Sequence, residues 1–401
     1  MTHAPDFKAL MSLVPVQGEI NATLDWAAPR AFWPEIAALD KCPQDSWHHA
    51  EGDVGTHTRM VVAALVNDPA WHRLPIRRAS ALFWAAILHD IGKPATTRHE
   101  DGRITSRGHS SEGARIARRL LWEAGAPIDW REEICGLIGA HQAPFWMIER
   151  EDPERLAAEI SLRCNTADLC LLARADATGR IAADQAGLMD NIALAAETFS
   201  EAACLGRPYP FPNDSARVEN LRKPHRPLSH APFEDHRCTA TILCGLPGAG
   251  KDTWIADHRK SRGLVSLDDL RLEMGAKPHE TPGQVVQAAR ECARQYLRDE
   301  TDFIWNATNL NRMRRRALVD LCLDYGARVS IVYLETDAAT LFSRNRTRPD
   351  GLPVKTLRAM IPRVEAPDLS EAHDVMLSGL KSRASLEVLP DQLGAAEPHL
   401  Y

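Results

Sequence analysis

Hydrophobic residues between about residues 54 and 200 recur with the period of a helix. Met60, Val61, Ala64 and Leu65 fall on one face, and His57 lies on the same face. Similar patterns predict helices over residues 81–89, 110–124, 130–141, 155–179 and 181–203, and a shorter one over residues 26–39. We find no strand-like alternation in this half. The pattern therefore predicts an all-helical domain, which we place at residues 1–205.

The pattern changes after a proline-rich stretch. Residues 206–236 hold six prolines together with a basic cluster, and proline disfavours both helices and central strands. We predict a linker or an extended strap there. Beyond it, strand-length apolar runs at about 239–244, 263–267, 302–306 and 328–334 alternate with helical stretches. This alternation is typical of a parallel α/β sheet, which we place in a second domain at residues 237–401.

Composition adds few constraints to this multidomain picture. The 401 residues are 44% hydrophobic and 25% charged, as in soluble globular proteins. A net charge of −6 gives no global basic field, so a nucleic-acid partner would need local patches. The nine cysteines form no Cys-x-x-Cys pair, which favours free thiols in the cytoplasm. We find no signal-peptide layout and no bilayer-length apolar run, and we expect no membrane partner.

A glycine-rich sequence follows the first strand-like run of the second half. Residues 245–253 read Gly-Leu-Pro-Gly-Ala-Gly-Lys-Asp-Thr. Between a strand and a helix, Gly245, Gly248 and Gly250 would let backbone N–H groups surround phosphates, and Lys251 would reach the outer ones. The alternative is a chance glycine-rich turn, which the spacing disfavours. Asp252 replaces the usual Ser/Thr and Thr253 follows it; either could contact Mg²⁺.

Histidines and aspartates in the helical half lie where apolar residues are expected. His141 continues an apolar helix stripe, and Asp176 continues another. A lone inward histidine is more often an ordinary core residue, but a buried carboxylate is costly unless it is paired or binds a metal. Several imidazoles together with two aspartates favour a metal site. The candidate ligands are His57, His89, Asp90, His109, His141 and Asp176.

The spacing of these residues resembles the HD phosphohydrolase superfamily, which is all-helical and metal-dependent and acts on phosphate esters. More narrowly, the motifs at residues 51–57, 108–114 and 173–180 resemble the HD domain of bacterial CCA-adding tRNA nucleotidyltransferases, over roughly residues 45–200. The resemblance implies that His57, His89, Asp90 and Asp176 hold one divalent cation. It also implies hydrolysis of 2′,3′-cyclic phosphate and 2′-phosphate.

Three further residues of the helical half have two interpretations each. By the same resemblance, His109 and His141 would bind a second metal or the phosphate. Lys93 is either a catalytic phosphate contact or a cation at a helix C-terminus. Mn²⁺, Co²⁺ and Ni²⁺ all suit nitrogen and oxygen ligands, and the sequence does not choose among them.

The second half carries the groups that phosphoryl transfer requires. Asp268 follows a strand-like run, where a carboxylate can accept a proton from an attacking hydroxyl. Residues 341–349 place three arginines at alternate positions; such an array is either a solvated helix face or a phosphate-neutralising lid. Residues 314–316 are all arginine and form either a nucleic-acid patch or a solvated face.

These motifs resemble, in order and spacing, phage-type 5′-OH polynucleotide kinases over about residues 238–365. The resemblance implies that Asp268 is the general base on the 5′-OH and that Arg271 holds the acceptor phosphate. Arg344 and Arg348 would contact the donor phosphates. The residues that would line the acceptor site are Thr308, Asn309 and Asn311. The implied cofactors are ATP or another NTP, with Mg²⁺.

The two halves together resemble bacterial bifunctional HD–polynucleotide-kinase proteins, which heal RNA or DNA ends. The resemblance implies removal of a cyclic, 2′- or 3′-phosphate, addition of a 5′ phosphate and, downstream, a nucleic-acid ligase. One alternative is a nucleotide or small-metabolite phosphohydrolase fused to a small-molecule kinase. Another is an ATP-gated regulator without turnover. RNA or DNA preference and oligomeric state stay open.

Overall fold

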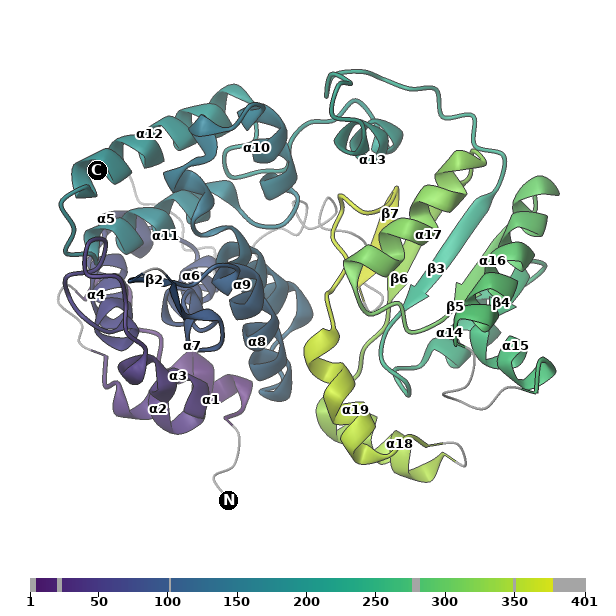
Figure 1. Ribbon diagram of the computed structural model, residues 1–401, viewed down its shortest axis with the longest axis horizontal. Helices are drawn as coiled ribbons and strands as arrows, with labels where there is room; N and C mark the ends of the chain where they lie inside the picture. Colours follow the sequence, from purple (N-terminus) through teal and green to yellow (C-terminus); the bar gives the residue numbers. More distant parts are fainter. Residues whose placement is uncertain (1–4, 20–23, 101, 276–281, 349–350, 378–401) are drawn as a thin grey trace, which may run out of the picture. The chain divides into compact units, whose positions relative to one another are not determined.

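A computed structural model describes residues 5–19, 24–100, 102–275, 282–348 and 351–377. The chain divides into two compact units (Figure 1). The first comprises the described parts of Met1–Phe211 and Thr336–Val364, and the second those of Pro212–Glu335 and Glu365–Tyr401. None of the helices in the described residues is both long and apolar enough to cross a bilayer.

The first unit is built from helices around a large apolar core. The core includes Trp71, Phe83 and Trp84, none of which is accessible to solvent. Helix α6 passes through the centre of this core and is buried from Ala79 to Leu88. The elements from residue 7 to residue 201 are α1 Phe7–Ser12, α2 Ala27–Phe32, α3 Pro34–Ala37, η1 Ala38–Lys41, α4 Val54–Val66, α5 Pro69–His72, α6 Ile76–Leu88, α7 Lys93–Thr96, β1 Arg98–Glu100, β2 Arg103–Thr105, α8 His109–Glu123, α9 Ile128–Ala140, η2 Ala143–Phe145, η3 Met147–Glu149, α10 Pro153–Ser161, α11 Thr166–Thr178 and α12 Gln185–Glu201.

The prediction of a helical first half is confirmed, with three local differences. Strands β1 and β2 form a short antiparallel hairpin that the pattern missed, because its exposed residues show no apolar alternation. The helix expected over residues 155–179 is two helices, since Asn165 caps a new helix with its side chain. A short helix, α7, follows the one predicted over residues 81–89, and Pro94 lies in its first turn, where proline is tolerated.

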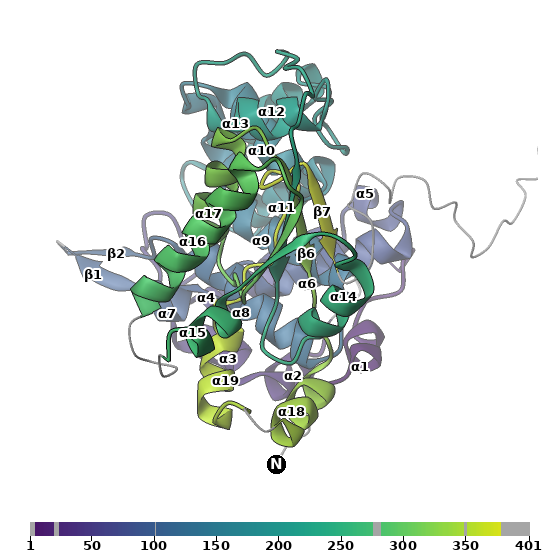
Figure 2. The ribbon, with the colours of Figure 1, turned by 90° about the vertical axis from the view of Figure 1, so that its right-hand side faces the viewer.

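The second unit contains a five-stranded parallel sheet covered by helices, which confirms the predicted α/β class (Figures 1 and 2). The strand order is β4-β5-β3-β6-β7, so β3 is central. The sequence pattern missed edge strand β7, which pairs with β6 from Ser330–Asp374 onward. The elements are α13 Asp214–Arg222, β3 Thr239–Cys244, α14 Lys251–His258, β4 Gly263–Ser266, α15 Leu267–Glu273, α16 Pro282–Arg298, β5 Phe303–Asn306, α17 Arg312–Asp324, β6 Arg328–Tyr333 and β7 Asp374–Leu377.

Residues 206–236, which we predicted to be a linker or an extended strap, contain the helix α13. The six prolines flank residues 214–222 and leave nine residues free to form a helix, which Asn213 caps by accepting a hydrogen bond from Ala216 N–H. Arg217 and Arg222 fasten this helix to the segment before β7 by donating to the carbonyls of residues 369–373. The helix therefore belongs to the second unit.

Residues 336–364 follow β6 in sequence but pack with the first unit. Trp122 Nε1–H donates to the carbonyl of Thr336 at 3.0 Å, and Arg118 Nη1–H donates to that of Val364 at 3.5 Å. Both donors lie on α8, so one helix holds both ends of the segment. The segment contains α18 Ala338–Thr347, α19 Val354–Met360 and η4 Ile361–Arg363.

Candidate metal and nucleotide sites

The six predicted ligand residues of the first unit meet in one buried cluster. His57 lies in α4, Asp176 in α11, and His109 is the first residue of α8. His89 and His141 directly follow the last residues of α6 and α9. All five residues are buried, as is the sixth, Asp90, and none of the six is more than 5% exposed.

Backbone carbonyls fix the orientation of three imidazoles. His89, His109 and His141 each place Nδ1 2.8 Å from the carbonyl oxygen three residues earlier. A carbonyl oxygen can only accept, so Nδ1 carries the proton and Nε2 keeps its lone pair. In the neutral ring with this tautomer, Nε2 is the nitrogen that can bind a cation.

One group of candidate metal-ligand atoms comes together between α4, α6 and α11. His57 Nε2 lies 3.1 Å from Asp176 Oδ1, 3.4 Å from His89 Nε2 and 3.8 Å from Asp90 Oδ2. His89 Nε2 is 3.3 Å from Asp90 Oδ2. Cation–ligand bonds of about 2.1 Å separate neighbouring donors by roughly 3.0–3.4 Å. His57, His89 and Asp90 thus fit one divalent cation, and Asp176 lies beside His57 at the edge of this group.

A second group shares the same aspartate. Asp90 Oδ1 lies 3.3 Å from His109 Nε2 and 3.8 Å from His141 Nε2, and the two Nε2 atoms are 3.3 Å apart. Asp90 Oδ1 is buried and has no hydrogen-bond partner among the described residues. A buried carboxylate oxygen without a donor is unfavourable unless a cation contacts it. The residues present thus also fit a second cation, with Asp90 between the two groups.

The electrostatics of the cluster keep its carboxylates charged. Burial alone would raise the pKa of Asp90, but the Lys93 ammonium and the imidazoles outweigh it and hold the pKa well below the ordinary value. Burial opposes ionisation of Asp176 too, yet Arg180 and His57 lower its pKa. Burial and the neighbouring histidines lower the pKa of His141 to about 3. The cluster therefore offers anionic oxygens and a neutral imidazole.

A surrounding layer of side chains holds the ligands, and the sequence did not identify it. Glu51 Oε1 lies 3.0 Å from His57 Nδ1 and 2.8 Å from His49 Nδ1, so one carboxylate orients both rings. Arg180 donates two hydrogen bonds of 2.9 Å to Asp176. Glu51 and Arg180 both lie in the motifs used for the HD resemblance. Arg180 lies four residues after Asp176, a spacing visible in the sequence, whereas the pairing of Glu51 with His57 appears only in the fold.

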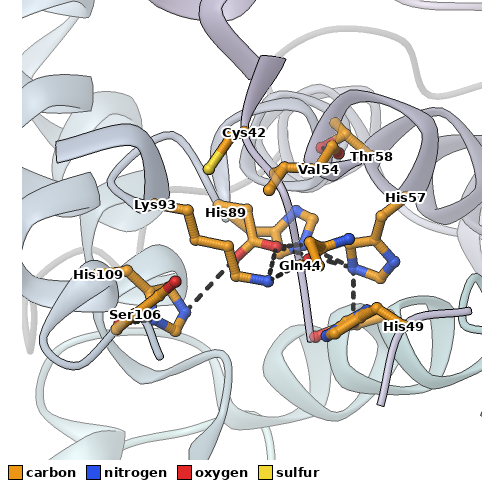
Figure 3. A network of polar contacts seen from close by, with 12 residues as sticks. Cys42, Gln44, His49, Val54, His57, Thr58, His89, Lys93, Ser106 and His109 are labelled. Carbon is orange, nitrogen blue, oxygen red and sulfur yellow. Dashed lines mark hydrogen bonds and ion pairs between the residues drawn. The ribbon is translucent and has the colours of Figure 1, made fainter. Parts of the chain in front are cut away.

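Lys93 contacts the cluster directly. Its Nζ lies 2.7 Å from Asp90 Oδ2 and donates to Gln44 Oε1 at 2.6 Å (Figure 3). Gly92 lets the loop approach α8, since a Cβ there would lie 2.2 Å from the carbonyl oxygen of His109. The Asp-Ile-Gly-Lys sequence of residues 90–93 thus joins α6 and α8 at the site.

The second unit forms a phosphate loop between β3 and α14. Gly245, Gly248 and Gly250 have φ of 146°, 83° and 105°, the left-handed region that favours glycine. A Cβ on Gly245 would lie 2.2 Å from the carbonyl oxygen of Leu334, so only glycine fits there. Lys251 begins α14, and its Nζ donates to the carbonyls of Gly245 and Leu246 at 3.1 and 3.0 Å. The loop lies at the carboxyl end of the central strand, where parallel α/β sheets bind ligands.

Two family models match the chain; the first match lies within the first unit, and the second covers most of the second unit together with residues 336–364. Residues 56–181 match the HD domain and residues 241–367 match the AAA domain. The chain joins an HD region to a P-loop α/β region. The first contains the histidine and aspartate cluster, and the second contains the phosphate loop. An HD region implies a divalent cation, and a P-loop indicates nucleotide binding.

Curated relatives resemble the HD region. The "Multifunctional CCA protein" of Pseudomonas fluorescens strain SBW25 is 38% identical over 134 residues, which are 33% of this chain and 30% of that protein. The same-named protein of strain Pf0-1 is 32% identical over 134 residues, with the same shares. The "CC-adding tRNA nucleotidyltransferase" of Thermus thermophilus is 35% identical over 112 residues, 27% of this chain and 24% of that protein. The chain thus spans less than a third of the length of these relatives.

In the P-loop region, Asp252 is exposed and accepts a hydrogen bond from Asn306 Nδ2 at 3.2 Å. Thr253 is also exposed. Asn306 ends strand β5, which is adjacent to β3, so it approaches the loop from the neighbouring strand. The carboxylate is accessible to a Mg²⁺ ion, and its role as a ligand stays a prediction.

The predicted acceptor residues of the P-loop region have different surroundings. Asp268 is the second residue of α15, beyond β4; its side chain is 82% exposed and pairs with Arg271. Asn309 Nδ2 donates to the carbonyl of Leu243 at 2.7 Å, and the Asn311 side chain caps α17. Thr308 accepts a hydrogen bond from Gly245 N–H through its backbone carbonyl. Asp268 and Arg271 are thus open to a substrate, whereas the two asparagine side chains have structural partners.

The arginine run at residues 314–316 is not a continuous patch. Arg314 and Arg316 are exposed, but Arg315 is fully buried and donates two 2.7 Å hydrogen bonds to Glu371. Its Nη1 donates to the carbonyls of Asn309 and Glu365. Both interpretations of this run were wrong for Arg315, because successive helix residues point about 100° apart and here the middle arginine faces the core.

The predicted lid arginines lie in the segment that packs with the HD region. Arg344 is in the last turn of α18, and Arg348 is the residue that ends this helix. Both are exposed. The P-loop unit by itself therefore does not contain them, and their contact with donor phosphates stays a prediction.

Proposed function

We propose that this protein repairs broken nucleic-acid ends with two separate active sites. The HD region would hydrolyse 2′,3′-cyclic phosphate, 2′-phosphate or 3′-phosphate ends. The P-loop region would transfer the γ-phosphate of ATP or another NTP to a 5′-OH end. The observation that carries the proposal is the presence, in one chain, of a buried histidine and aspartate cluster and a separate phosphate loop. RNA as a substrate is supported by a relative of the HD region named as a tRNA nucleotidyltransferase.

In the HD region, His57, His89, Asp90 and Asp176 would hold one cation, and Asp90, His109 and His141 a second. A divalent cation at such a site neutralises charge on the phosphate and lowers the pKa of water. The protein supplies ligands whose protons are already in place, because Nδ1 of His89, His109 and His141 faces a carbonyl oxygen. Lys93, which is 2.7 Å from Asp90, would direct an N–H donor at a phosphate oxygen.

In the P-loop region, backbone N–H groups and Lys251 would hold the donor phosphates. Asp268 would accept the proton of the 5′-OH. The hydroxyl oxygen would bond to the γ-phosphorus as the bond from that phosphorus to the β–γ bridging oxygen breaks, and the nucleoside diphosphate would leave. Arg271, beside Asp268, would bind the acceptor's phosphate. The exposure of Asp268 supports this role, because a bulky polynucleotide end must reach it.

The decisive experiment uses an RNA nick that carries a 2′,3′-cyclic phosphate and a 5′-OH, with ATP and Mn²⁺. We expect both ends to change: the cyclic phosphate opens or is removed, and the 5′ end gains label from γ-labelled ATP. Such ends would suit a nucleic-acid ligase. Turnover of free nucleotides and nucleosides with both RNA ends unchanged would replace the proposal by a small-molecule hydrolase–kinase. Binding of ATP without any turnover would indicate a regulator.

A further inference from the structure

Gln44 is a buried amide beside the HD cluster that no motif singled out. It lies on the segment between η1 and α4, is 8% exposed, and its Oε1 accepts the 2.6 Å hydrogen bond from Lys93 Nζ (Figure 3). The same Nζ lies 2.7 Å from Asp90 Oδ2. Gln44 therefore contacts Lys93, which in turn contacts the Asp90 carboxylate shared by the two groups of candidate ligands.

The chemistry of Lys93 decides which way the amide faces. An ammonium group donates hydrogen bonds and cannot accept them, so the carbonyl oxygen of Gln44 must face Lys93. The NH₂ group then points away from Lys93. Gln44 Nε2 is buried and has no hydrogen-bond partner within the part of the chain that the structure describes.

A buried NH₂ group without an acceptor is unfavourable, and such groups in folded proteins usually contact a ligand or water. The acceptor for Gln44 should lie next to Asp90 and Lys93 and should be one that only accepts. A non-bridging phosphate oxygen has this property, and Lys93 adds positive charge beside it. A carboxylate of the protein would serve as well, but none of the described carboxylates contacts Nε2.

We propose that Gln44 is a phosphate-binding residue of the HD site. Its NH₂ group donates to a non-bridging oxygen of the terminal phosphate, and its carbonyl oxygen positions Lys93 for a second donation. The inference rests on the proposed function in one respect, that the HD region acts on a phosphate ester. It adds a residue that neither the family resemblance nor the sequence motifs indicated.

Two substitutions separate donation from positioning. Gln44→Glu keeps an oxygen for Lys93 but removes both N–H donors and adds a charge that repels phosphate. Gln44→Met has a similar size and removes both functions. Gln17→Met is the matched control: Gln17 also lies in the first unit, but its amide donates to the backbone carbonyls of Trp71, His72 and Leu74, away from the cluster.

The full-length, Mn²⁺-loaded protein and its variants should be compared by inhibition constants and thermal shifts with inorganic phosphate. Metal content and the KM and kcat on RNA with a 2′,3′-cyclic phosphate complete the comparison. We expect both Gln44 variants to bind phosphate about 10- to 100-fold more weakly, as for loss of a hydrogen bond to a charged group. KM should rise by a similar factor, while metal content stays that of the wild type. Gln44→Met should also lower kcat, because Lys93 loses its partner.

Two results would overturn the proposal. If Gln44→Glu binds phosphate as the wild type does, the amide only positions Lys93 or only fills space. If both variants lose bound Mn²⁺ with no change in phosphate affinity per loaded protein, the role is structural. Failure of the proposed function looks different, because phosphate would still stabilise the wild-type protein while no nucleic-acid end is hydrolysed.

Discussion

The two sites of this chain are built in opposite ways. In the HD cluster the candidate ligands are side chains of buried residues, and backbone carbonyls hold three of the imidazoles. In the P-loop region the backbone shapes the site, and the proposed base Asp268 is 82% exposed. Lys251 is occupied by loop carbonyls that it would exchange for phosphates.

The difference follows from what each site has to bind. A cation needs several donors at fixed distances of about 2 Å, and only a packed core holds side chains that tightly. Phosphates and a polynucleotide end are large, so their site must stay open and use N–H groups that a loop can supply without side chains. The buried site should therefore be sensitive to single side chains, and the open one to its lysine and its backbone.

The largest expected effect tests whether the two sites are independent. Asp90→Asn removes the carboxylate shared by both groups of candidate ligands and should lower phosphoesterase activity more than about 100-fold. This loss is larger than the one expected for a residue that only orients a ligand. Kinase activity should be unchanged. Lys251→Ala should do the reverse, with a kinase loss of about 100- to 1,000-fold.

Each variant is the control for the other, and both activities should be measured on one preparation. Circular dichroism and metal content would show that the protein is folded. Loss of both activities from either single change in folded protein would contradict separate sites.

The next prediction concerns buried charge in the P-loop region, where it supports the fold instead of binding a cation. Arg315→Met leaves Glu371 buried without its partner and should lower the free energy of unfolding by about 3–5 kcal/mol, measured by urea denaturation. Arg314→Met, at an exposed neighbouring position, should change it by less than about 0.5 kcal/mol. Equal effects of the two changes would mean that the ion pair contributes little.

Acid should destabilise the P-loop region through His373. Burial and the neighbouring His236 lower the pKa of His373 to about 4, and its Nδ1 accepts a hydrogen bond from Val329 N–H. In the unfolded chain this histidine binds a proton near pH 6.5. Its contribution to the free energy of unfolding is therefore fully present above that pH and is lost as the pH drops toward 4. The loss should reach about 3 kcal/mol.

His373→Asn keeps an acceptor for Val329 and removes the titration. The slope of unfolding free energy against pH, between pH 6.5 and 4, should therefore be flatter in this variant than in the wild type. An identical slope would assign the acid sensitivity to other groups.

The smallest predicted effect tests the layer that supports the HD cluster. Glu51→Gln weakens the orientation of His57 and should lower Mn²⁺ affinity about 10- to 100-fold, measured by competition with a chelator. Glu159→Gln, on the surface of α10, should leave the affinity unchanged. If Glu51→Gln also has no effect, burial alone orients His57.

The sequence by itself was sufficient for features that are local or periodic. Helical periodicity identified the first half, and inward-facing positions identified His141 and Asp176, because a polar group on an apolar stripe is visible without a partner. The phosphate loop was visible for a related reason: its conformation depends on glycines that are adjacent in the chain. The parallel sheet followed from the alternation of strands and helices.

The tertiary structure decided what depends on partners distant in sequence. Gln44 is paired with Lys93, 49 residues away, and Arg315 with Glu371, 56 residues away. Glu51 is known as a support for His57 only because the two atoms meet 3.0 Å apart. Edge strand β7 and helix α13 are short and depend on long-range contacts with β6 and residues 369–373. A hydrophobic pattern records which face of an element is buried, but the identity of the group across from it depends on packing, and only the folded chain shows it.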